Sequence, residues 1–206
     1  MIFPEGMKEI ASLAFQDCRS LTGEVVLPST IKKIGAGAFF SAKITKVNLP
    51  EGLEKVESYA FFYMNSLEEF VFPSTLKTLG GEACAYCRGL KRIYCAATVP
   101  PTCEDSPANP GDTPFGPYSG GELMPSNDIP VYVPIGTSEL YRNAWGWNYF
   151  NNIIETDNFP RTTSIAGHVQ EQEDLHPIFY DLTGKKINKP IKGRIYLRHG
   201  GKVLIR

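Results

Sequence analysis

The chain has 206 residues, of which 42% are apolar, and a formal net charge of −1. This length accommodates one or two domains with a packed core. The near-zero net charge excludes an overall field that would attract nucleic acid or an anionic membrane, and no run approaches the ~18–20 consecutive apolar residues of a transmembrane helix. The chain starts inside a repeat unit, without a basic start or an apolar leader typical of a signal peptide, so we expect it to be part of a longer protein.

Residues 3–95 contain four copies of one pattern, each marked by a proline. The prolines are 24, 22 and 23 residues apart, at Pro4, Pro28, Pro50 and Pro73. An aliphatic residue stands six positions after each proline, an aromatic residue or Cys84 stands eleven positions after it, and a second aliphatic residue closes each copy. A period of this length is typical of a solenoid, in which each turn buries its apolar face only against its neighbours. Solenoids mostly act as binding surfaces, so any chemistry needs separate evidence.

One short strand is predicted in each turn, just before the proline. Two or three β-branched or aromatic residues form it, and proline ends it because proline cannot donate a hydrogen bond to the ladder. Strands repeated once per turn would form a parallel sheet in which alternate side chains point inward. The predicted inward residues are Val25, Leu27, Val47, Leu49, Phe70 and Phe72. The predicted outward residues are Glu24, Val26, Lys46, Asn48, Glu69, Val71, Arg92 and Tyr94.

The outward face of this sheet is the candidate binding surface. Its charges alternate in sign from strand to strand, so we expect them to compensate one another in exposed pairs worth ~0–1 kcal/mol each rather than to form a charged ligand site. An aromatic patch remains toward the C-terminal end, and exposed aromatic residues suit recognition. The alternative is that these are ordinary scattered apolar residues. The candidate ligand-binding residues are Val71, Arg92, Tyr94 and Tyr132.

Four of the five cysteines follow the pattern C-x2-C-x7-C-x7-C, which raises the question of a metal or redox site. A single CxxC pair followed by loosely spaced cysteines is a weak zinc signal. Cys84, Cys87 and Cys95 also occupy repeat positions that hold core residues in other copies, and free cysteine is often buried as a small hydrophobe. We therefore expect packing residues, with no metal and no cofactor. A disulfide between Cys95 and Cys103 is left open.

Residues 104–128 are rich in Pro, Gly, Ser and Asp and form a long insertion in the fifth repeat, with Phe115 expected in the aromatic position. Such a loop is either mobile or functional, and no calcium-loop pattern is present. A short helix is predicted from Thr137 or Ser138, either of which can cap it. We expect its two tryptophans to cover the last repeat, with a sugar-stacking platform as the alternative. The predicted apolar face of this helix comprises Leu140, Tyr141, Ala144, Trp145 and Trp147.

The composition changes after residue 155. A polar linker leads into a strand near residues 164–166, and β-hairpins follow from Pro177. Residues 184–206 hold eight Lys or Arg and no acid, which could bind nucleic acid or anionic glycans, but a solvated strand face is the better interpretation because no base-stacking aromatic cluster accompanies it. No nucleophile-elbow, metalloprotease or phosphate-loop motif occurs, so we reject catalysis. All three histidines lie after residue 155: His168, His176 and His199.

The repeat pattern resembles the BspA-like leucine-rich repeats of bacterial, especially Bacteroidetes, surface proteins. The pattern Ile-Gly-x-x-Ala-Phe is matched at residues 34–39 and, with substitutions, at 10–15, 56–61 and 79–84, where Cys84 replaces the consensus Phe. Residues 131–155 resemble the closing unit of such arrays, so the resemblance covers about 150 of the 206 residues. Residues 180–206 resemble a module that ends many secreted Bacteroidetes proteins and is associated with export or surface attachment.

The resemblance implies a secreted or surface-anchored protein, some relatives being adhesins for host proteins, and it implies no catalytic residue. We predict a β-rich α/β solenoid of leucine-rich repeats of about 23 residues with a short capping helix (1–155), then a linker and a small β-hairpin or β-sandwich module (156–206). The predicted function is a non-enzymatic extracellular or cell-surface adhesion scaffold for host or bacterial surface proteins. The alternatives are a structural stalk and a carbohydrate-binding protein that uses Tyr94, Tyr132 or Trp147.

Overall fold

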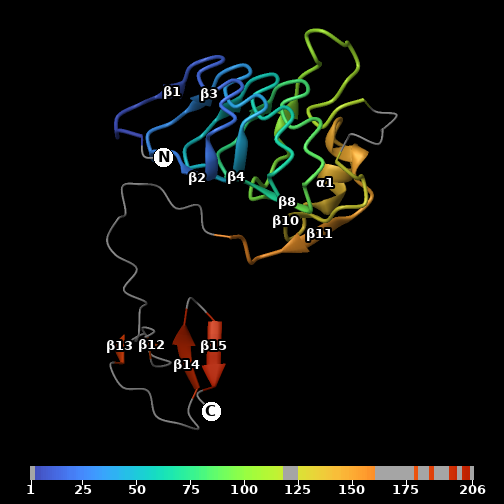
Figure 1. Ribbon diagram of the computed structural model, residues 1–206. Coiled ribbons are helices and arrows are strands. Elements are labelled where there is room, and N and C mark those ends of the chain that lie inside the picture. The colour runs from blue at the N-terminus through green and yellow to red at the C-terminus, as the bar shows by residue number, and fades with distance from the viewer. Residues whose placement is uncertain are drawn as a thin grey trace. The chain divides into compact units, whose positions relative to one another are not determined.

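The computed structural model of this chain describes residues 3–117 and 125–160, and four strands between residues 179 and 204. The chain divides into two compact units, residues 1–167 and 168–206. The first unit is a solenoid built from short parallel strands and turns, with little helix (Figure 1). This arrangement confirms the predicted leucine-rich repeat solenoid.

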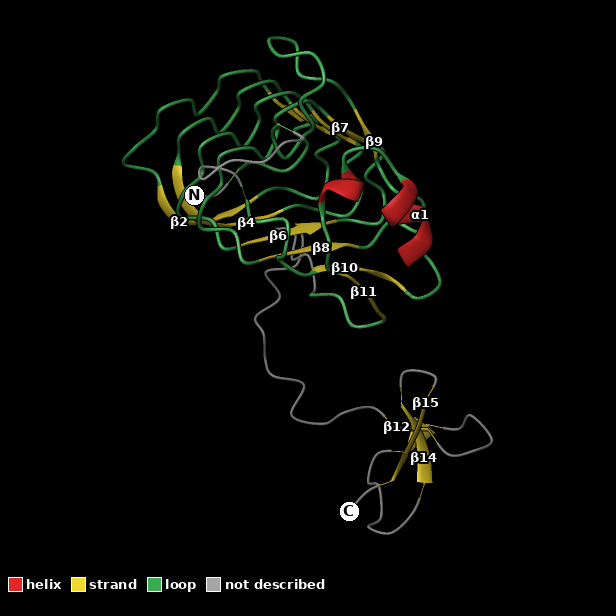
Figure 2. Ribbon diagram, turned by 90° about the vertical axis from the view of Figure 1, so that its right-hand side faces the viewer, coloured by secondary structure: helices red, strands yellow, loops and turns green. Residues whose placement is uncertain are grey.

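Parallel strands follow one another along two sides of the solenoid (Figure 2). The side that the sequence predicted carries one strand of each turn: β2 (Thr22–Val26), β4 (Lys43–Asn48), β6 (Glu69–Phe72), β8 (Arg92–Cys95), β10 (Val131–Pro134) and β11 (Ile153–Thr156). The other side carries a five-stranded sheet that the sequence did not reveal: β1 (Glu9–Ile10), β3 (Lys33–Ile34), β5 (Lys55–Val56), β7 (Thr78–Leu79) and β9 (Thr102–Cys103). Strands of two residues are too short to show an alternating pattern.

Consecutive turns lie so close together that two of the repeat glycines are required. A Cβ atom on Gly35 would lie 2.5 Å from the backbone nitrogen of Ser12, and one on Gly80 would lie 2.3 Å from that of Ser58. The turns that precede these glycines carry Ala11 and Glu57, respectively, at the same repeat position. A side chain at either glycine would therefore meet the backbone of the preceding turn.

The core contains a column of aromatic rings, one from each of the first three turns. Three rings from successive turns stack nearly parallel, with centroids 5.3 and 5.7 Å apart: Phe15, Phe39 and Phe61. Cys84 takes the next place in the column and is fully buried. The backbone N–H of Cys84 donates to the carbonyl of Pro114 at 2.8 Å, and the equivalent hydrogen bond links each of the earlier turns to the next. The residue after Pro114 is the buried Phe115. The prediction that Phe115 fills the aromatic position of the fifth turn is confirmed.

The unequal spacing of the prolines is accompanied by irregular strand pairing. The ladder between β2 and β4 shifts register after Gly23, which has a φ of +79°: Gly23 pairs with Ile44 and Glu24 pairs with Lys46, so Thr45 of β4 is the unpaired residue. The second copy is one residue short between Phe39 and Ile44, and β4 and β6 belong to different sheets. The prediction of one continuous parallel sheet on this side is therefore wrong: β2 pairs with β4, and β6, β8, β10 and β11 form a separate ladder.

Inward and outward residues on these strands follow the predicted alternation except at Asn48. The predicted inward side chains are all buried. Asn48 was expected to face outward, but it is buried, and its amide donates a hydrogen bond to the carboxylate of Glu24 on the neighbouring strand. A buried amide is tolerated when it is hydrogen-bonded in this way.

The predicted charge compensation across the strands is confirmed. Lys46 lies 3.2 Å from Glu24 and Arg92 lies 2.7 Å from Glu69, each pair joining residues that are partners in a ladder. Both pairs are partly exposed, so each contributes little to stability.

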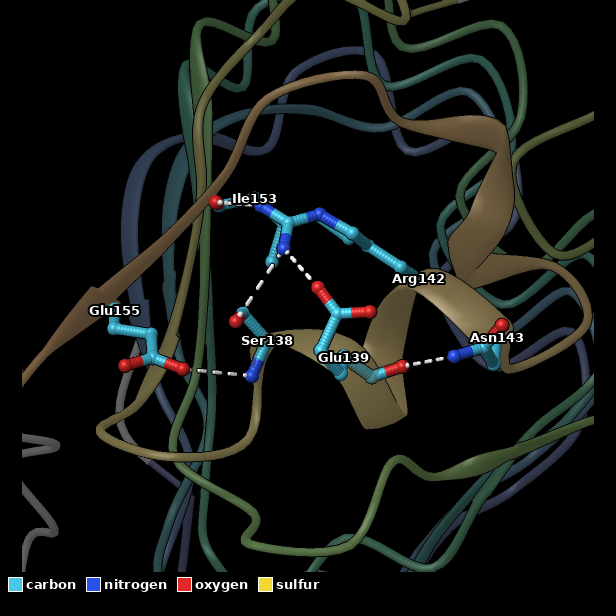
Figure 3. Close-up of polar contacts among 6 residues, drawn as sticks. All are labelled: Ser138, Glu139, Arg142, Asn143, Ile153 and Glu155. Atoms are coloured by element: carbon cyan, nitrogen blue, oxygen red, sulfur yellow. Dashed lines mark hydrogen bonds and ion pairs between the residues drawn. The ribbon is translucent and has the colours of Figure 1, made fainter.

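Helix α1 (Ser138–Asn143) and the 3-10 helix η1 (Trp147–Tyr149) follow β10. The predicted side-chain caps are wrong, because the Thr137 hydroxyl donates to the carbonyl of Pro134 at 2.6 Å instead. The carboxylate of Glu155 in β11 accepts the backbone N–H of Ser138 at 3.0 Å (Figure 3). Hydrogen bonds from the backbone of Gly136 and of Ser138 lower the pKa of Glu155 to about 2. A residue from the next strand therefore caps α1.

The predicted apolar face of this segment is only partly correct. Tyr141 and Trp147 are fully buried, whereas Leu140 is 52% and Trp145 is 38% exposed. The helix ends at Asn143, so Trp145 no longer follows the helical period. The indole N–H of Trp147 donates to the carbonyl of Pro101 at 2.9 Å. Trp147 therefore covers the last repeat as predicted, and its burial overturns its alternative role as a sugar platform.

All five cysteines are free thiols, so Cys95 and Cys103 form no disulfide. Burial raises the pKa of Cys87 to about 12 and that of Cys95 to about 11. The Tyr141 hydroxyl donates to the sulfur of Cys95 at 3.2 Å. These protonated, buried thiols are packing residues, as the sequence predicted.

The second unit contains an antiparallel sheet whose strand order is β13-β12-β14-β15. The strands lie where the sequence predicted hairpin strands: β12 (Phe179–Tyr180), β13 (Lys186–Ile187), β14 (Ile195–Arg198) and β15 (Gly201–Leu204). The strand expected near residues 164–166 and the three histidines lie outside the described residues.

Candidate binding surface

An apolar row crosses the outward face of the four-stranded ladder. The register places Val71 beside Tyr94, Tyr94 beside Tyr132, and Tyr132 beside Ile154. Neighbouring strands lie ~4.8 Å apart, so side chains at partnered positions contact one another. The structure thus brings Val71, Tyr94 and Tyr132 together, and Arg92 lies two residues before Tyr94 on the same face.

The two tyrosines of this row form a stacked pair. Their ring centroids are 4.6 Å apart and their planes differ by 14°. Phe159 presents an edge to Tyr94, with the centroids 6.5 Å apart and the planes at 73°. Because the tyrosines come from adjacent strands, their ring faces are turned along the sheet and their edges toward solvent. Both rings are half-buried, and Ile154 is exposed at the end of the row.

Arg92 borders the row as a compensated charge. Its Nε donates to the carboxylate of Glu69 at 2.7 Å. This hydrogen bond and the charge of Glu69 raise the pKa of Arg92. The nearby phenols of Tyr94 and Tyr132 raise it further. The row therefore presents ring edges and aliphatic groups beside a neutralised ion pair, without a strong field of either sign.

Sequence reasoning missed Ile154 and Phe159 as parts of this surface. Ile154 could have been found, because alternation along residues 153–156 places it outward once Ile153 is inward. Phe159 could not, because it follows the last strand and its position depends on the path of the chain after Thr156.

The side chains of this surface offer contacts and no covalent chemistry. Phenols, aliphatic side chains and an ion-paired guanidinium supply contact area and hydrogen bonds, and none of them is an activated nucleophile. Among the residues that the structure describes, no group of three or more His, Cys, Asp or Glu is placed to hold a metal ion.

Residues 1–104 match the family described as BspA type Leucine rich repeat region, in six copies. The chain belongs to this family. Such repeats are in general non-enzymatic, protein-binding scaffolds, and BspA-type proteins are typically found at cell surfaces. The resemblance drawn from the repeat pattern is thereby confirmed, whereas the resemblance of residues 180–206 to an export module stays a prediction.

Three solved chains are similar to this one. One of them is the crystal structure of T. pallidum Leucine Rich Repeat protein (TpLRR), with 22% identity, 74% of this chain covered and a TM-score of 0.47. The chain spans 66% of the length of that protein. Comparison with curated proteins finds no match. Within the described part of the chain, no helix has the length and apolar character needed to cross a membrane.

Proposed function

We propose that this chain is a secreted or cell-surface adhesion scaffold that binds a protein through the row of Val71, Tyr94, Tyr132 and Ile154, with Arg92 at its border. The observation that carries this proposal is the stacked Tyr94–Tyr132 pair on an open sheet face. Tyrosine is enriched at the hot spots of protein interfaces, because it offers rigid apolar area together with a polar tip. Membership in a family of protein-binding scaffolds supports the same function.

The geometry of the pair favours a protein partner over a glycan. A sugar ring stacks on a free aromatic face, whereas Tyr94 and Tyr132 cover one face of each other, and their remaining faces are turned toward Val71 and Ile154. Exposed ring edges suit the apolar side chains of a protein. Trp147, the third aromatic residue considered for a sugar, is buried. The proposed partners are therefore host or bacterial surface proteins, with glycan binding as the alternative and a structural stalk as the third possibility.

The test is a binding screen of the folded chain against arrayed extracellular-matrix proteins and glycans, followed by affinity measurements on the hits. Tyr94→Ala and Tyr132→Ala should each weaken a protein hit by about thirtyfold, which corresponds to the ~2 kcal/mol of a hot-spot residue. Tyr94→Phe keeps the stack and should bind nearly as well as the natural chain. Trp145→Ala, a partly exposed aromatic residue outside the row, is the matched control and should leave the affinity unchanged.

Three results would contradict the proposal. Competition of the interaction by free oligosaccharide would support the glycan alternative. No binding on either array, from a chain shown to be folded by its thermal unfolding, would support the stalk. An affinity that falls equally for Trp145→Ala and Tyr94→Ala would show that the row is not the binding surface.

We also propose that residues 156–206 form a separate domain that serves export or surface attachment, whereas residues 1–155 carry recognition. The distinct composition of the segment and its own antiparallel sheet support this division. Deleting residues 156–206 in the producing cell should leave the repeats folded but abolish delivery to the surface, as measured by cell fractionation. Unchanged delivery would contradict the assignment.

A further inference from the structure

The short second repeat interrupts the sheet beside the Tyr94 row. Five positions separate Phe39 from Ile44, whereas six separate Phe15 from Leu21 and Phe61 from Leu67. At this point β4 and β6 lie next to each other along the solenoid but belong to different sheets (Figure 2). The deviation in repeat length therefore coincides with a break in backbone pairing.

Two surface hollows lie along this break and share Ser66. The first has a volume of about 280 Å³ and is lined by Arg19, Ser41, Lys43, Tyr63 and Asn65 in addition to Ser66 and Ala42. The second has a volume of about 290 Å³ and includes Lys46, Glu69 and Arg92. We call the two hollows together the seam groove. Each is slightly smaller than the ~300–1,000 Å³ of a typical small-molecule pocket, and suits side chains of a peptide better.

The charges in the two hollows differ. In the second hollow Lys46 and Arg92 are paired with carboxylates, as described above. The first hollow is lined by two cations and by no carboxylate. Among the described residues Lys43 takes part in no ion pair, and Arg19 approaches only Asp17, at 3.7 Å, with both side chains largely exposed. Positive charge in the seam groove is thus concentrated at Lys43 and Arg19, where an anionic group would be favoured.

An aromatic wall borders the first hollow. Tyr63 stacks on Tyr86 with the centroids 4.9 Å apart, Phe62 presents an edge to Tyr63 at 5.1 Å, and Phe40 stacks on Phe62 at 5.0 Å. All four rings are half-buried. Their faces are largely covered by one another, so the exposed parts are ring edges, which suit aliphatic and aromatic side chains rather than sugar rings.

Acidic groups lie at the far end of this aromatic wall. The buried carboxylate of Glu82 is held by Ser106 at 2.6 Å and Asn109 at 2.9 Å. Burial, followed by the electrostatic influence of Glu82, Tyr63 and Asp112, raises the pKa of Tyr86. The wall therefore runs from a positive end at Lys43 to a negative end at Tyr86, and an anionic ligand is directed to the Lys43 end.

We propose that the seam groove binds an acidic segment of a protein partner, whose carboxylates contact Lys43 and Arg19 while an adjacent apolar side chain packs against Tyr63. Complementary charge and an apolar neighbour within one groove are the features that a peptide carrying both acidic and apolar residues would satisfy together. The first hollow shares no residue with the Tyr94 row, so this site can be tested independently of that row.

The test uses the full chain and a short fluorescein-labelled peptide in which pairs of glutamates are separated by single phenylalanines. Binding is followed by fluorescence anisotropy at low and at high salt. Lys43→Glu should weaken binding by about tenfold or more, because it removes one attraction and adds one repulsion. Lys8→Glu changes the net charge equally at an exposed lysine in the turn before β1, and should have little effect. Tyr94→Ala should leave peptide binding unchanged.

The aromatic part of the site needs a variant that preserves the backbone. Tyr63 has a φ of +61°, a left-handed conformation that asparagine adopts more readily than other non-glycine residues. Tyr63→Asn should therefore fold and should bind the peptide several-fold more weakly. A peptide with serine in place of phenylalanine should lose affinity for the natural chain and be insensitive to this variant.

A third variant tests the origin of the groove. Insertion of one serine between Lys43 and Ile44 gives the second repeat the same spacing as its neighbours. We expect the insertion to restore pairing between β4 and β6, seen as slower amide hydrogen exchange in these strands, and to abolish peptide binding. Restored pairing with unchanged binding would overturn the proposal.

Other outcomes would also overturn the inference. Equal losses for Lys43→Glu and Lys8→Glu would indicate attraction to overall charge without a site. Binding of a sulfated oligosaccharide in place of the peptide, sensitive to Lys43→Glu but not to Tyr63→Asn, would assign the groove to an anionic glycan. Neither result would bear on the Tyr94 row, whose own variants decide that proposal.

Discussion

Replacing Cys84 with phenylalanine is a direct test of how this core is packed. Cys84 occupies the position that holds Phe15, Phe39 and Phe61 in the other three copies. The repeat pattern alone predicts that phenylalanine at this position stabilises the chain, because a fully buried phenylalanine side chain contributes ~1.5–3 kcal/mol relative to an exposed one.

The structure predicts the opposite sign. A continuous series of ring contacts runs from the turn before Cys84 to the turn after it, with centroids 5.2–6.3 Å apart, in the order Phe61, Phe70, Phe72, Trp147 and Phe115. The third turn thus carries two phenylalanines where the first carries the smaller Val25 and Leu27. Cys84 is fully buried in the same core as these larger rings. We therefore expect Cys84→Phe to overpack the core and to destabilise it by ~1–3 kcal/mol.

Guanidinium unfolding followed by tryptophan fluorescence measures this change, because Trp147 is part of the same series of rings. Cys84→Ala is the control: it removes only a sulfur atom from a fully buried site and should cost about 1 kcal/mol through the small cavity that it leaves. A Cys84→Phe chain that unfolds at a higher denaturant concentration than the natural chain, with the same dependence on denaturant, would refute the packing argument.

Two further predictions concern a cap and a close contact. The pKa of Glu155 falls from its ordinary 4.5 to about 2 on folding, so its carboxylate stabilises the folded chain above pH ~4.5 and loses this effect as the pH falls through about 2. Thermal unfolding of the natural chain and of Glu155→Gln should therefore differ at pH 7 and converge near pH 2, and a constant difference would contradict the cap. Gly80→Ala would place a Cβ atom 2.3 Å from the backbone nitrogen of Ser58, and we expect a loss of ~1–3 kcal/mol in denaturant unfolding. An unfolding midpoint equal to that of the natural chain would show that the turns can move apart.

Much of the fold and part of the candidate site could be predicted because they repeat. Val71 and Tyr94 occupy the same outward position in adjacent repeats, so their contact follows from the alignment alone. Tyr132 required the additional recognition of the closing unit, since the long insertion hides the period before it. Phe115 could be assigned to the aromatic column because the repeat pattern resumes within the insertion at residues 104–128.

The errors arose where a residue depends on contacts outside its own repeat. Asn48 has the alternation of an outward residue, yet a hydrogen bond to Glu24 on the preceding turn buries it. Leu140 and Trp145 satisfy a helical period, but α1 spans only six residues and ends before Trp145. Ile154 and Phe159 join the candidate site only through the path of the chain beyond the repeats.

By itself, the sequence determined the solenoid, the strands before the prolines, the inward residues and the buried role of the cysteines. It did so because a turn of this length can bury its periodic apolar residues only against similar turns. The tertiary structure alone decided that β4 and β6 do not pair across the short second repeat, that Glu155 caps a helix that begins 17 residues earlier, at Ser138, and that the tyrosines stack face to face. The short second repeat is visible in the sequence, but which strands it leaves unpaired is visible only in the structure. The cap and the tyrosine stack depend on how one turn meets the next, and the spacing of residues within a turn does not specify that contact.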